Sequence, residues 1–90
     1  MTKAAIDPAE VRRFAHDLKR FTGELQTRLM ALHGRFQALG DTWEDQEHEK
    51  FAKEFDLTLK ALSKFVERSD LHTLHLLRKS ERAEAYLAQR

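Results

Sequence analysis

The sequence predicts an all-α fold, an antiparallel two-helix hairpin that dimerises into a four-helix bundle. Apolar residues recur in steps of three and four through both halves of the chain, a glycine stands between the halves, and neither glycine nor proline follows it. The 90 residues are interpreted as one helical-hairpin domain, 1–90, with a first helix at about 8–39, a turn at about 40–42 and a second helix at about 43–86.

The first helix begins at the stretch DPAE. Asp7 is a good N-cap, Pro8 suits the first helical position because its missing N–H would be unpaired there, and Glu10 completes a capping box. One row of its apolar face keeps seven-residue steps while the other row drifts, which indicates a nearly straight helix rather than a long supercoil. The expected core residues are Val11, Phe14, Leu18, Phe21, Leu25, Leu29, Leu32 and Phe36.

The turn follows at Gly40, where a helix C-cap is expected, and Asp41 or Thr42 can cap the second helix. An acidic cluster in the first turn of this helix is favoured by the helix dipole, and it comprises Glu44, Asp45 and Glu47. The stretch ERSD at 67–70 is the weakest part of the helix, because Ser and Asp compete for backbone hydrogen bonds. The expected core residues here are Phe51, Phe55, Leu59, Leu62 and Val66, continued by Thr73, Leu76, Ala83 and Leu87.

Each helix has an apolar face wider than one neighbouring helix can cover. At about 25 cal/mol per Å2, leaving several Phe and Leu side chains in water forgoes several kcal/mol, comparable to the stability of a small domain. We therefore expect the hairpin to pair with itself, as a homodimer, or with a similar helical hairpin. The residues off the main stripe are Leu57, Phe65, Leu71, Leu74 and Leu77.

The charge is nearly balanced at +1, and its distribution is uneven. Residues 40–54 carry six Asp/Glu against two Lys/Arg, whereas residues 71–90 carry four Lys/Arg against two Asp/Glu. The basic residues of the first helix are spread over its surface without an aromatic stacking platform, so no nucleic-acid partner is expected. No apolar run approaches the length of a membrane span.

No combination of residues predicts chemistry. Cysteine is absent, and His72 and His75, three apart on a helix, lack a fixed third metal ligand. Glu44 and Glu47 lie in the first turn of a helix, where dipole and capping roles are favoured over acid–base catalysis. We expect no enzyme activity, no cofactor and no metal site.

The tryptophan in the central turn gives the chain its resemblance to a known family. With Trp43 followed by Phe51 and Phe55 between two long amphipathic helices, residues 8–85 resemble the W-x-G family, the small Esx-type helical hairpins associated with type VII secretion. Trp43 falls on the family's tryptophan, and Asp45 stands at its glycine position.

The family's export signal often has an acidic residue four positions after a tyrosine, and here Arg90 follows Tyr86 at that distance. The resemblance implies a non-enzymatic dimer that acts as a secretion substrate or export-pathway factor, moved by a type VII ATPase. Trp43, with the acidic residues beside it, would contribute to a recognition surface. The structural alternative is that Trp43 covers the end of the hairpin against Leu39 and Phe51.

The alternative function is an intracellular helical interaction module, such as an adaptor or an antitoxin-like partner of a larger protein. The start MTKAAIDPAE lacks the apolar core of a cleaved signal peptide. We therefore expect a protein that is secreted without such a peptide, or that is cytoplasmic before export.

Overall fold

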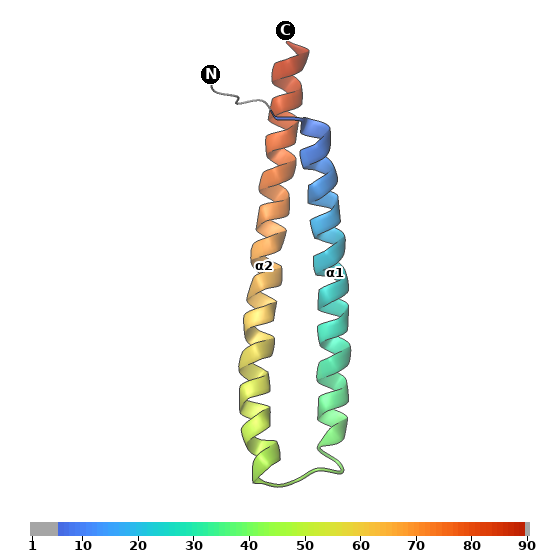
Figure 1. The fold of residues 1–90 in the computed structure, drawn as a ribbon, viewed down its shortest axis with the longest axis vertical. Coiled ribbons are helices and arrows are strands. Elements are labelled where there is room, and N and C mark those ends of the chain that lie inside the picture. Colours follow the sequence, from blue (N-terminus) through green and yellow to red (C-terminus); the bar gives the residue numbers. More distant parts are fainter. Residues whose placement is uncertain (1–5, 90) are drawn as a thin grey trace.

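The computed structural model describes residues 6–89, which form two long antiparallel helices, α1 (Pro8–Leu39) and α2 (Gln46–Ala88). They lie side by side in a rod of 67 × 24 × 15 Å (Figure 1). The turn lies at one end of the rod, and α2 continues past the start of α1 at the other, which we call the open end. The all-α hairpin expected from the sequence is confirmed.

The start of α1 is fixed by its cap. Oδ1 of Asp7 accepts hydrogen bonds from the backbone N–H of Ala9 at 3.0 Å and of Glu10 at 3.4 Å, with Pro8 at the first helical position. The Glu10 side chain makes a different bond from the expected capping box. It accepts from Nη1 of Arg13 at 2.6 Å, and this hydrogen bond raises the pKa of the Arg13 guanidinium.

The turn is longer than expected from the sequence, and the cap of α2 is Asp45 rather than Asp41 or Thr42. Residues 40–43 fold back onto the end of α1, where the N–H groups of Thr42 and Trp43 each donate to the carbonyl of Leu39 at 3.0 Å. Together with the N–H groups of Gly40 and Asp41, which donate to the carbonyls of Gln37 and Ala38, they satisfy the last three carbonyls of α1. Oδ1 of Asp45 then accepts from the N–H of His48 at 2.9 Å, and α2 begins.

The seam is the set of side chains through which the two helices face each other, and small residues dominate its buried part. Ala15 is 0% exposed and Thr22 is 1% exposed. Small side chains at the contact let the backbones of two packed helices approach closely. The buried residues are Pro8, Ala15 and Thr22 on α1, and Val66, Ser69, Thr73 and Ser80 on α2.

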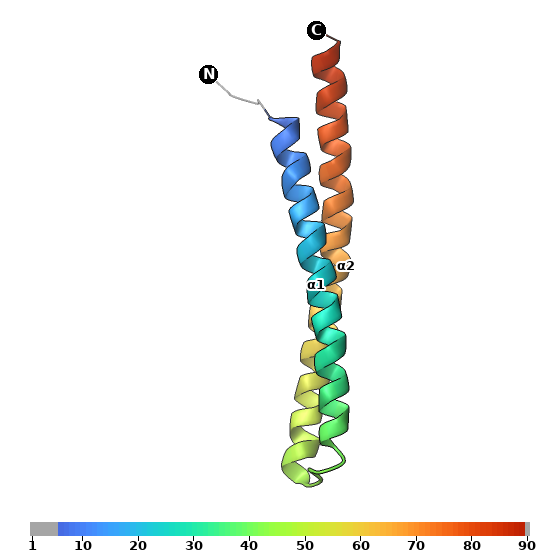
Figure 2. The same cartoon turned by 90° about the vertical axis from the view of Figure 1, so that its right-hand side faces the viewer.

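This seam corrects the predicted core of α1. The second row of the seam does not drift through Phe14 and Phe21, but keeps seven-residue steps from Pro8 through Ala15 and Thr22, and the half-buried Leu29 and Phe36 occupy the next two steps. The drift from which a nearly straight helix was inferred is therefore absent from the buried row, and Figure 2 shows α1 crossing α2 from one side to the other along the rod. An apolar pattern alone could not place Ala15 and Thr22, rather than Phe14 and Phe21, in the seam.

Three of the four buried hydroxyl side chains of the seam donate a hydrogen bond to a carbonyl of their own helix. Oγ1 of Thr22 donates to the carbonyl of Lys19 at 3.1 Å, Oγ1 of Thr73 to that of Ser69 at 3.0 Å, and Oγ of Ser80 to that of Leu77 at 2.8 Å. Each bond avoids the cost of burying an unpaired polar group. The stretch 67–70 is helical throughout, so the weak point expected there does not interrupt α2.

Two ion pairs join the helices toward the open end. Arg12 pairs with Glu84, and Nζ of Lys19 lies 3.3 Å from Oδ1 of Asp70. All four side chains are substantially exposed, so each pair contributes about 0–1 kcal/mol. Neither helix, within residues 6–89, is long and apolar enough to cross a membrane.

The seam predicts that Ala15 tolerates no larger side chain. The substitution Ala15→Leu should destabilise the hairpin by about 1–3 kcal/mol, because the added atoms must separate the helices. Chemical denaturation followed by circular dichroism measures this change. The exposed Ala31, on the same helix, provides the matched control, since Ala31→Leu should stay within about 0.5 kcal/mol of the wild type. Equal effects of the two substitutions would contradict the seam.

Candidate functional site

The turn holds an aromatic cluster that joins both helices. Phe36 of α1 stacks on the imidazole of His48 at a centroid distance of 5.2 Å, and meets the rings of Phe51 at 5.5 Å and Phe55 at 5.0 Å. Trp43 meets His48 edge-on at 5.0 Å and Phe51 at 6.5 Å. Such pairs contribute about 0.5–1.5 kcal/mol each beyond the burial of their area. The cluster therefore ties the turn to the ends of both helices.

His48 is the member of this cluster that sequence reasoning missed. Its Nε2 atom is buried and has no hydrogen-bond partner among residues 6–89. A side chain on Gly40 would crowd this place, since an added Cβ would stand 3.2 Å from the carbonyl oxygen of Gln37 and 3.9 Å from Cε1 of His48. One signal was available in the sequence: His48 precedes Phe55 by one heptad, and so lies on the same face of α2.

The structure gathers the predicted turn residues, Trp43, Glu44, Asp45 and Glu47, at one end of the rod. Trp43 is half-buried, and the three acidic residues are exposed. Asp45 occupies the position of the family's glycine with φ −153° and ψ −174°, an extended conformation that any residue adopts. It uses its carboxylate as the cap of α2, which explains why an aspartate is accepted there.

A second surface runs along one side of the rod, and we call it the outer face. Phe14 and Phe21 of α1 are 57% and 55% exposed, and Phe51 and Phe65 of α2 are both 45% exposed. Phe14, Phe21 and Phe65 each adjoin a buried seam residue in the sequence. Phe51 is partly covered by the aromatic cluster, where it packs on Phe36 and Phe55. The outer face thus leaves large aromatic side chains in water in a single hairpin.

The predicted core residues are therefore divided between three environments. Val66 and Thr73 are buried in the hairpin. Most of the others are half-buried along the edges of the seam: Val11, Leu18, Leu25, Leu29, Phe36, Phe55, Leu59, Leu62, Leu76 and Ala83. The remaining ones are exposed, namely Phe14, Phe21, Leu32, Phe51 and Leu87, and so they do not form a core within one hairpin. Two helices cover only the side chains that point directly between them.

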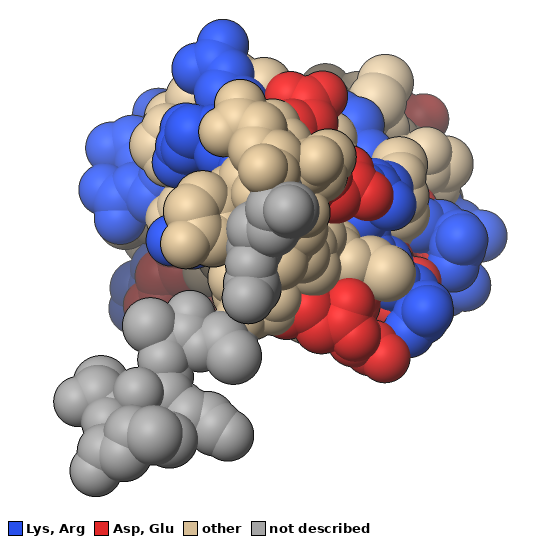
Figure 3. Space-filling model, turned by 90° about the horizontal axis from the view of Figure 1, so that it is seen from above, with Lys and Arg blue, Asp and Glu red and all other residues tan. Residues whose placement is uncertain are grey.

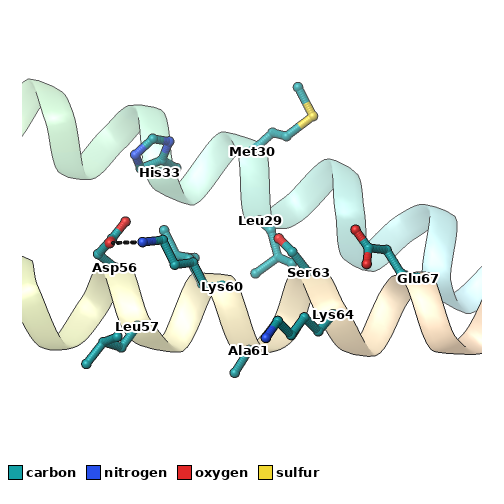
Figure 4. A pocket seen from close by; sticks show the side chains of 11 residues that line it. Leu29, Met30, His33, Asp56, Leu57, Lys60, Ala61, Ser63, Lys64 and Glu67 are labelled. Carbon is teal, nitrogen blue, oxygen red and sulfur yellow. Dashed lines mark ion pairs between the residues drawn. The ribbon is translucent and has the colours of Figure 1, made fainter.

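A groove of about 670 Å3 lies on the opposite side from the outer face, and we call it the rear groove. Figure 4 shows that Met30 and Leu57, which line it, point to opposite sides rather than toward a common centre. Lys60 and Asp56 form an ion pair of 3.2 Å beside it. Figure 4 shows that the other polar side chains of the groove, His33, Ser63, Lys64 and Glu67, are spread along the two helices and do not converge on one point.

The histidine pair of α2 lies on the surface, and part of the basic set of α1 is paired with carboxylates. Residues 6–89 contain no group of three or more His, Cys, Asp or Glu side chains able to hold a metal ion, and His72 and His75 are exposed. Four basic side chains of α1 are engaged in ion pairs with carboxylates, namely Arg12, Arg13, Lys19 and Arg20. Tyr86 is exposed near the end of α2, and Arg90 lies outside the described residues.

Solved structures similar to this chain share its hairpin. The crystal structure of the secreted protein EsxB from Bacillus anthracis strain Sterne matches with a TM-score of 0.80 and 24% identity, covering 96% of this chain and 98% of EsxB. A single-substitution variant of the same protein matches with a TM-score of 0.83 and 25% identity, covering 94% and 96% of the two chains. No curated relative matches the sequence.

The sequence itself matches the WXG100 family, described as proteins of 100 residues with WXG, over residues 3–84. This match spans nearly the whole chain and includes both helices and the turn with Trp43. The chain therefore belongs to the WXG100 family, as an Esx-type helical hairpin protein associated with type VII secretion.

Proposed function

We propose that this hairpin functions as a non-enzymatic dimer that is exported by an ATPase-driven type VII secretion machine. The observation that carries the proposal is the outer face, with its four exposed phenylalanines on an otherwise intact hairpin. The similarity to EsxB, a secreted protein, supports export. The absence of converging reactive groups in the rear groove and at the turn is consistent with a binding role.

The outer face explains why a dimer is required. A monomer with Phe14, Phe21, Phe51 and Phe65 near half exposure leaves apolar area in water that a second hairpin can cover. Pairing two outer faces around a two-fold axis uses the same surface on both copies and yields a four-helix bundle. A bundle of this kind has the second layer of helices that a single hairpin lacks.

The turn supplies the recognition surface in this proposal. Trp43 is half-buried against His48, so part of the indole remains accessible beside the exposed carboxylates of Glu44 and Glu47. An aromatic side chain with a charged rim is the arrangement found at the centre of many protein interfaces. A component of the export machine would bind this end of the rod.

Substitution on the outer face should separate dimer formation from folding. Phe21→Asp places a charge where the second copy would bury it, at a cost of about 3 kcal/mol, which raises Kd roughly a hundredfold. The variant should remain helical, because Phe21 is 55% exposed in the hairpin. Light scattering at micromolar concentration measures the mass, and circular dichroism measures the helicity.

Leu57 provides the matched control, since it is 66% exposed and lies beside the rear groove. Leu57→Asp should leave the dimer mass unchanged. Two outcomes would show that the outer face is not the interface. One is a monomeric wild type, and the other is a dimer that survives Phe21→Asp and dissociates with Leu57→Asp.

The variant Trp43→Ala should reduce export more than stability. Because the indole is half-buried, we expect it to cost less than the ~3–5 kcal/mol of a central aromatic. Phe36→Ala removes a ring that meets three others and should destabilise more. Thermal melts and export from a host with a type VII machine would be measured on the same proteins. Normal export of folded Trp43→Ala would refute the recognition role, and early melting would assign Trp43 to the fold.

A further inference from the structure

The rear edge of the seam, on the side away from the outer face, carries one row of mostly polar residues from each helix. Successive members of a row are seven residues apart, so they share one side of their helix. The row of α1 holds only basic or neutral side chains, and the row of α2 holds only acidic or neutral ones. The members are Arg12, Lys19, Gln26 and His33 on α1, and Asp56, Ser63, Asp70, Leu77 and Glu84 on α2.

Two ion pairs join these rows toward the open end. Arg12 pairs with Glu84, and Nζ of Lys19 lies 3.3 Å from Oδ1 of Asp70. Figure 3, which looks along the rod from the open end, shows Lys and Arg side chains next to Asp and Glu side chains on the surface. The rows thus bring opposite charges together across the seam in this half of the rod.

His33 and Asp56 repeat the geometry of the Lys19–Asp70 pair nearer the turn. His33 lies two heptads after Lys19 on α1, and Asp56 lies two heptads before Asp70 on α2. Because the helices are antiparallel, His33 stands opposite Asp56 as Lys19 stands opposite Asp70. Both His33 and Asp56 line the rear groove and also a smaller cavity of about 320 Å3 beside the turn. Figure 4 shows them on the facing sides of the two helices.

The contact that this geometry favours is not formed in the structure. His33 has no ion pair with any of residues 6–89, and Oδ2 of Asp56 lies 3.2 Å from Nζ of Lys60 in its own helix. Lysine is charged throughout the physiological pH range, whereas histidine is mostly charged only in mildly acidic solution. Position 33 therefore holds the one side chain of the α1 row whose charge depends on pH in this range.

We propose that His33 and Asp56 form an ion pair across the seam when the imidazole is protonated, and we call this pair the clasp. The imidazolium donates to the carboxylate of Asp56, which has an oxygen available because Lys60 contacts only Oδ2. The clasp is the third of a series with the two ion pairs toward the open end, and it adds a pH-sensitive contact beside the turn. It lies within one hairpin, on the side away from the outer face, so it does not depend on the proposed dimer.

The charged groups around His33 single out Asp56 as its partner. The titratable and charged side chains that α2 presents in the two cavities are Asp56, Lys60, Lys64, Glu67 and His48. On α1, the residues three and four positions away are uncharged, namely Leu29, Met30, Phe36 and Gln37. The two lysines and the two carboxylates of α2 balance in number. Of these charged side chains only Asp56 lines both cavities, and it occupies the heptad position opposite His33.

The clasp stabilises the hairpin in mildly acidic solution. Its contribution is present where histidine is charged, and it is lost as the pH rises through the range in which histidine releases its proton. At about pH 5.5 a carboxylate is still mostly ionised, so both partners are charged there. Because His33 and Asp56 are exposed, the pair should change the ratio of folded to unfolded protein about two- to fivefold.

A double-mutant cycle at two pH values tests the clasp. His33→Gln, Asp56→Asn and the double variant are unfolded with urea at about pH 5.5 and about pH 8, at one protein concentration, and circular dichroism follows the transition. The coupling between positions 33 and 56 should raise the folded-to-unfolded ratio about two- to fivefold at the lower pH and vanish at the higher. The cycle subtracts the loss of the contact with Lys60, because both variants that carry Asp56→Asn lack it.

The matched control is the same cycle at Lys19 and Asp70, which occupy the equivalent positions two heptads away. Lysine keeps its charge at both pH values, so the coupling between Lys19→Gln and Asp70→Asn should be the same at each. If this coupling also vanished at the higher pH, the effect would not come from the protonation of position 33, and the clasp would be overturned.

Conversion of His33 into the residue found at position 19 supplies a second test. His33→Lys should raise the folded-to-unfolded ratio about two- to fivefold over the wild type at the higher pH, because lysine is already charged there. At the lower pH the two proteins should differ little, since both carry a cation opposite Asp56. The gain should disappear in the Asp56→Asn background, where no carboxylate stands opposite position 33.

The outcomes separate the clasp from the proposed dimer. Coupling between positions 33 and 56 that is equal at both pH values, or absent at both, would overturn the clasp. A gain from His33→Lys that persists in the Asp56→Asn background would overturn it as well. A monomeric wild type would refute the dimer and leave the clasp standing, because its contacts lie within one hairpin.

Discussion

The close contact of α1 and α2 through small side chains is the constraint from which the rest of this structure follows. Ala15, Thr22, Ser69 and Ser80 fill the space between the helices over the half of the rod toward the open end. With two helices this near, no phenylalanine fits between them there. The large aromatic side chains are consequently placed on the flank of the hairpin, where they become available to a second chain. The geometry that holds the hairpin together also produces its interaction surface.

The two halves of the rod are stabilised by different interactions. Near the turn, the rings of Phe36, His48, Phe51 and Phe55 pack together, and this contact depends on shape and apolar area. Toward the open end, small side chains with self-satisfied hydroxyl groups are joined by exposed ion pairs, which contribute little. The turn half is thus the apolar anchor of the hairpin, whereas the open half depends more on covering by a partner.

The sequence predicted the features that are determined locally. Asp7 and Pro8 set the start of α1 through bonds within a few residues, and the hairpin, its orientation and the family resemblance followed from the apolar periodicity and the position of Trp43. The start of α2 was not predictable in this way. Several acidic residues can cap a helix, and the choice of Asp45 depends on residues 40–43 folding back onto α1.

The seam and the site were predicted only in part, for a related reason. An apolar pattern treats alanine, serine and threonine as neutral, yet these residues occupy the closest contact because their size, and not their hydropathy, decides where helices meet. The buried row of α1 could have been identified from spacing alone, since Pro8, Ala15 and Thr22 keep heptad steps. Glu44, Asp45 and Glu47 were expected in the first turn of the second helix, but only Glu47 lies there, because α2 begins after its cap, Asp45. The stacking of His48 against Phe36 requires knowledge of how the two helices are aligned.

Trp43 allows fluorescence to report on the turn separately from the helices. It is the only tryptophan of the chain, and it lies in the turn against the imidazole of His48. Intrinsic tryptophan emission therefore comes from one end of the rod, while far-ultraviolet ellipticity comes from the whole length of both helices. Any difference between the two signals during heating measures how far the turn opens independently of the helices, and no label has to be introduced to observe it.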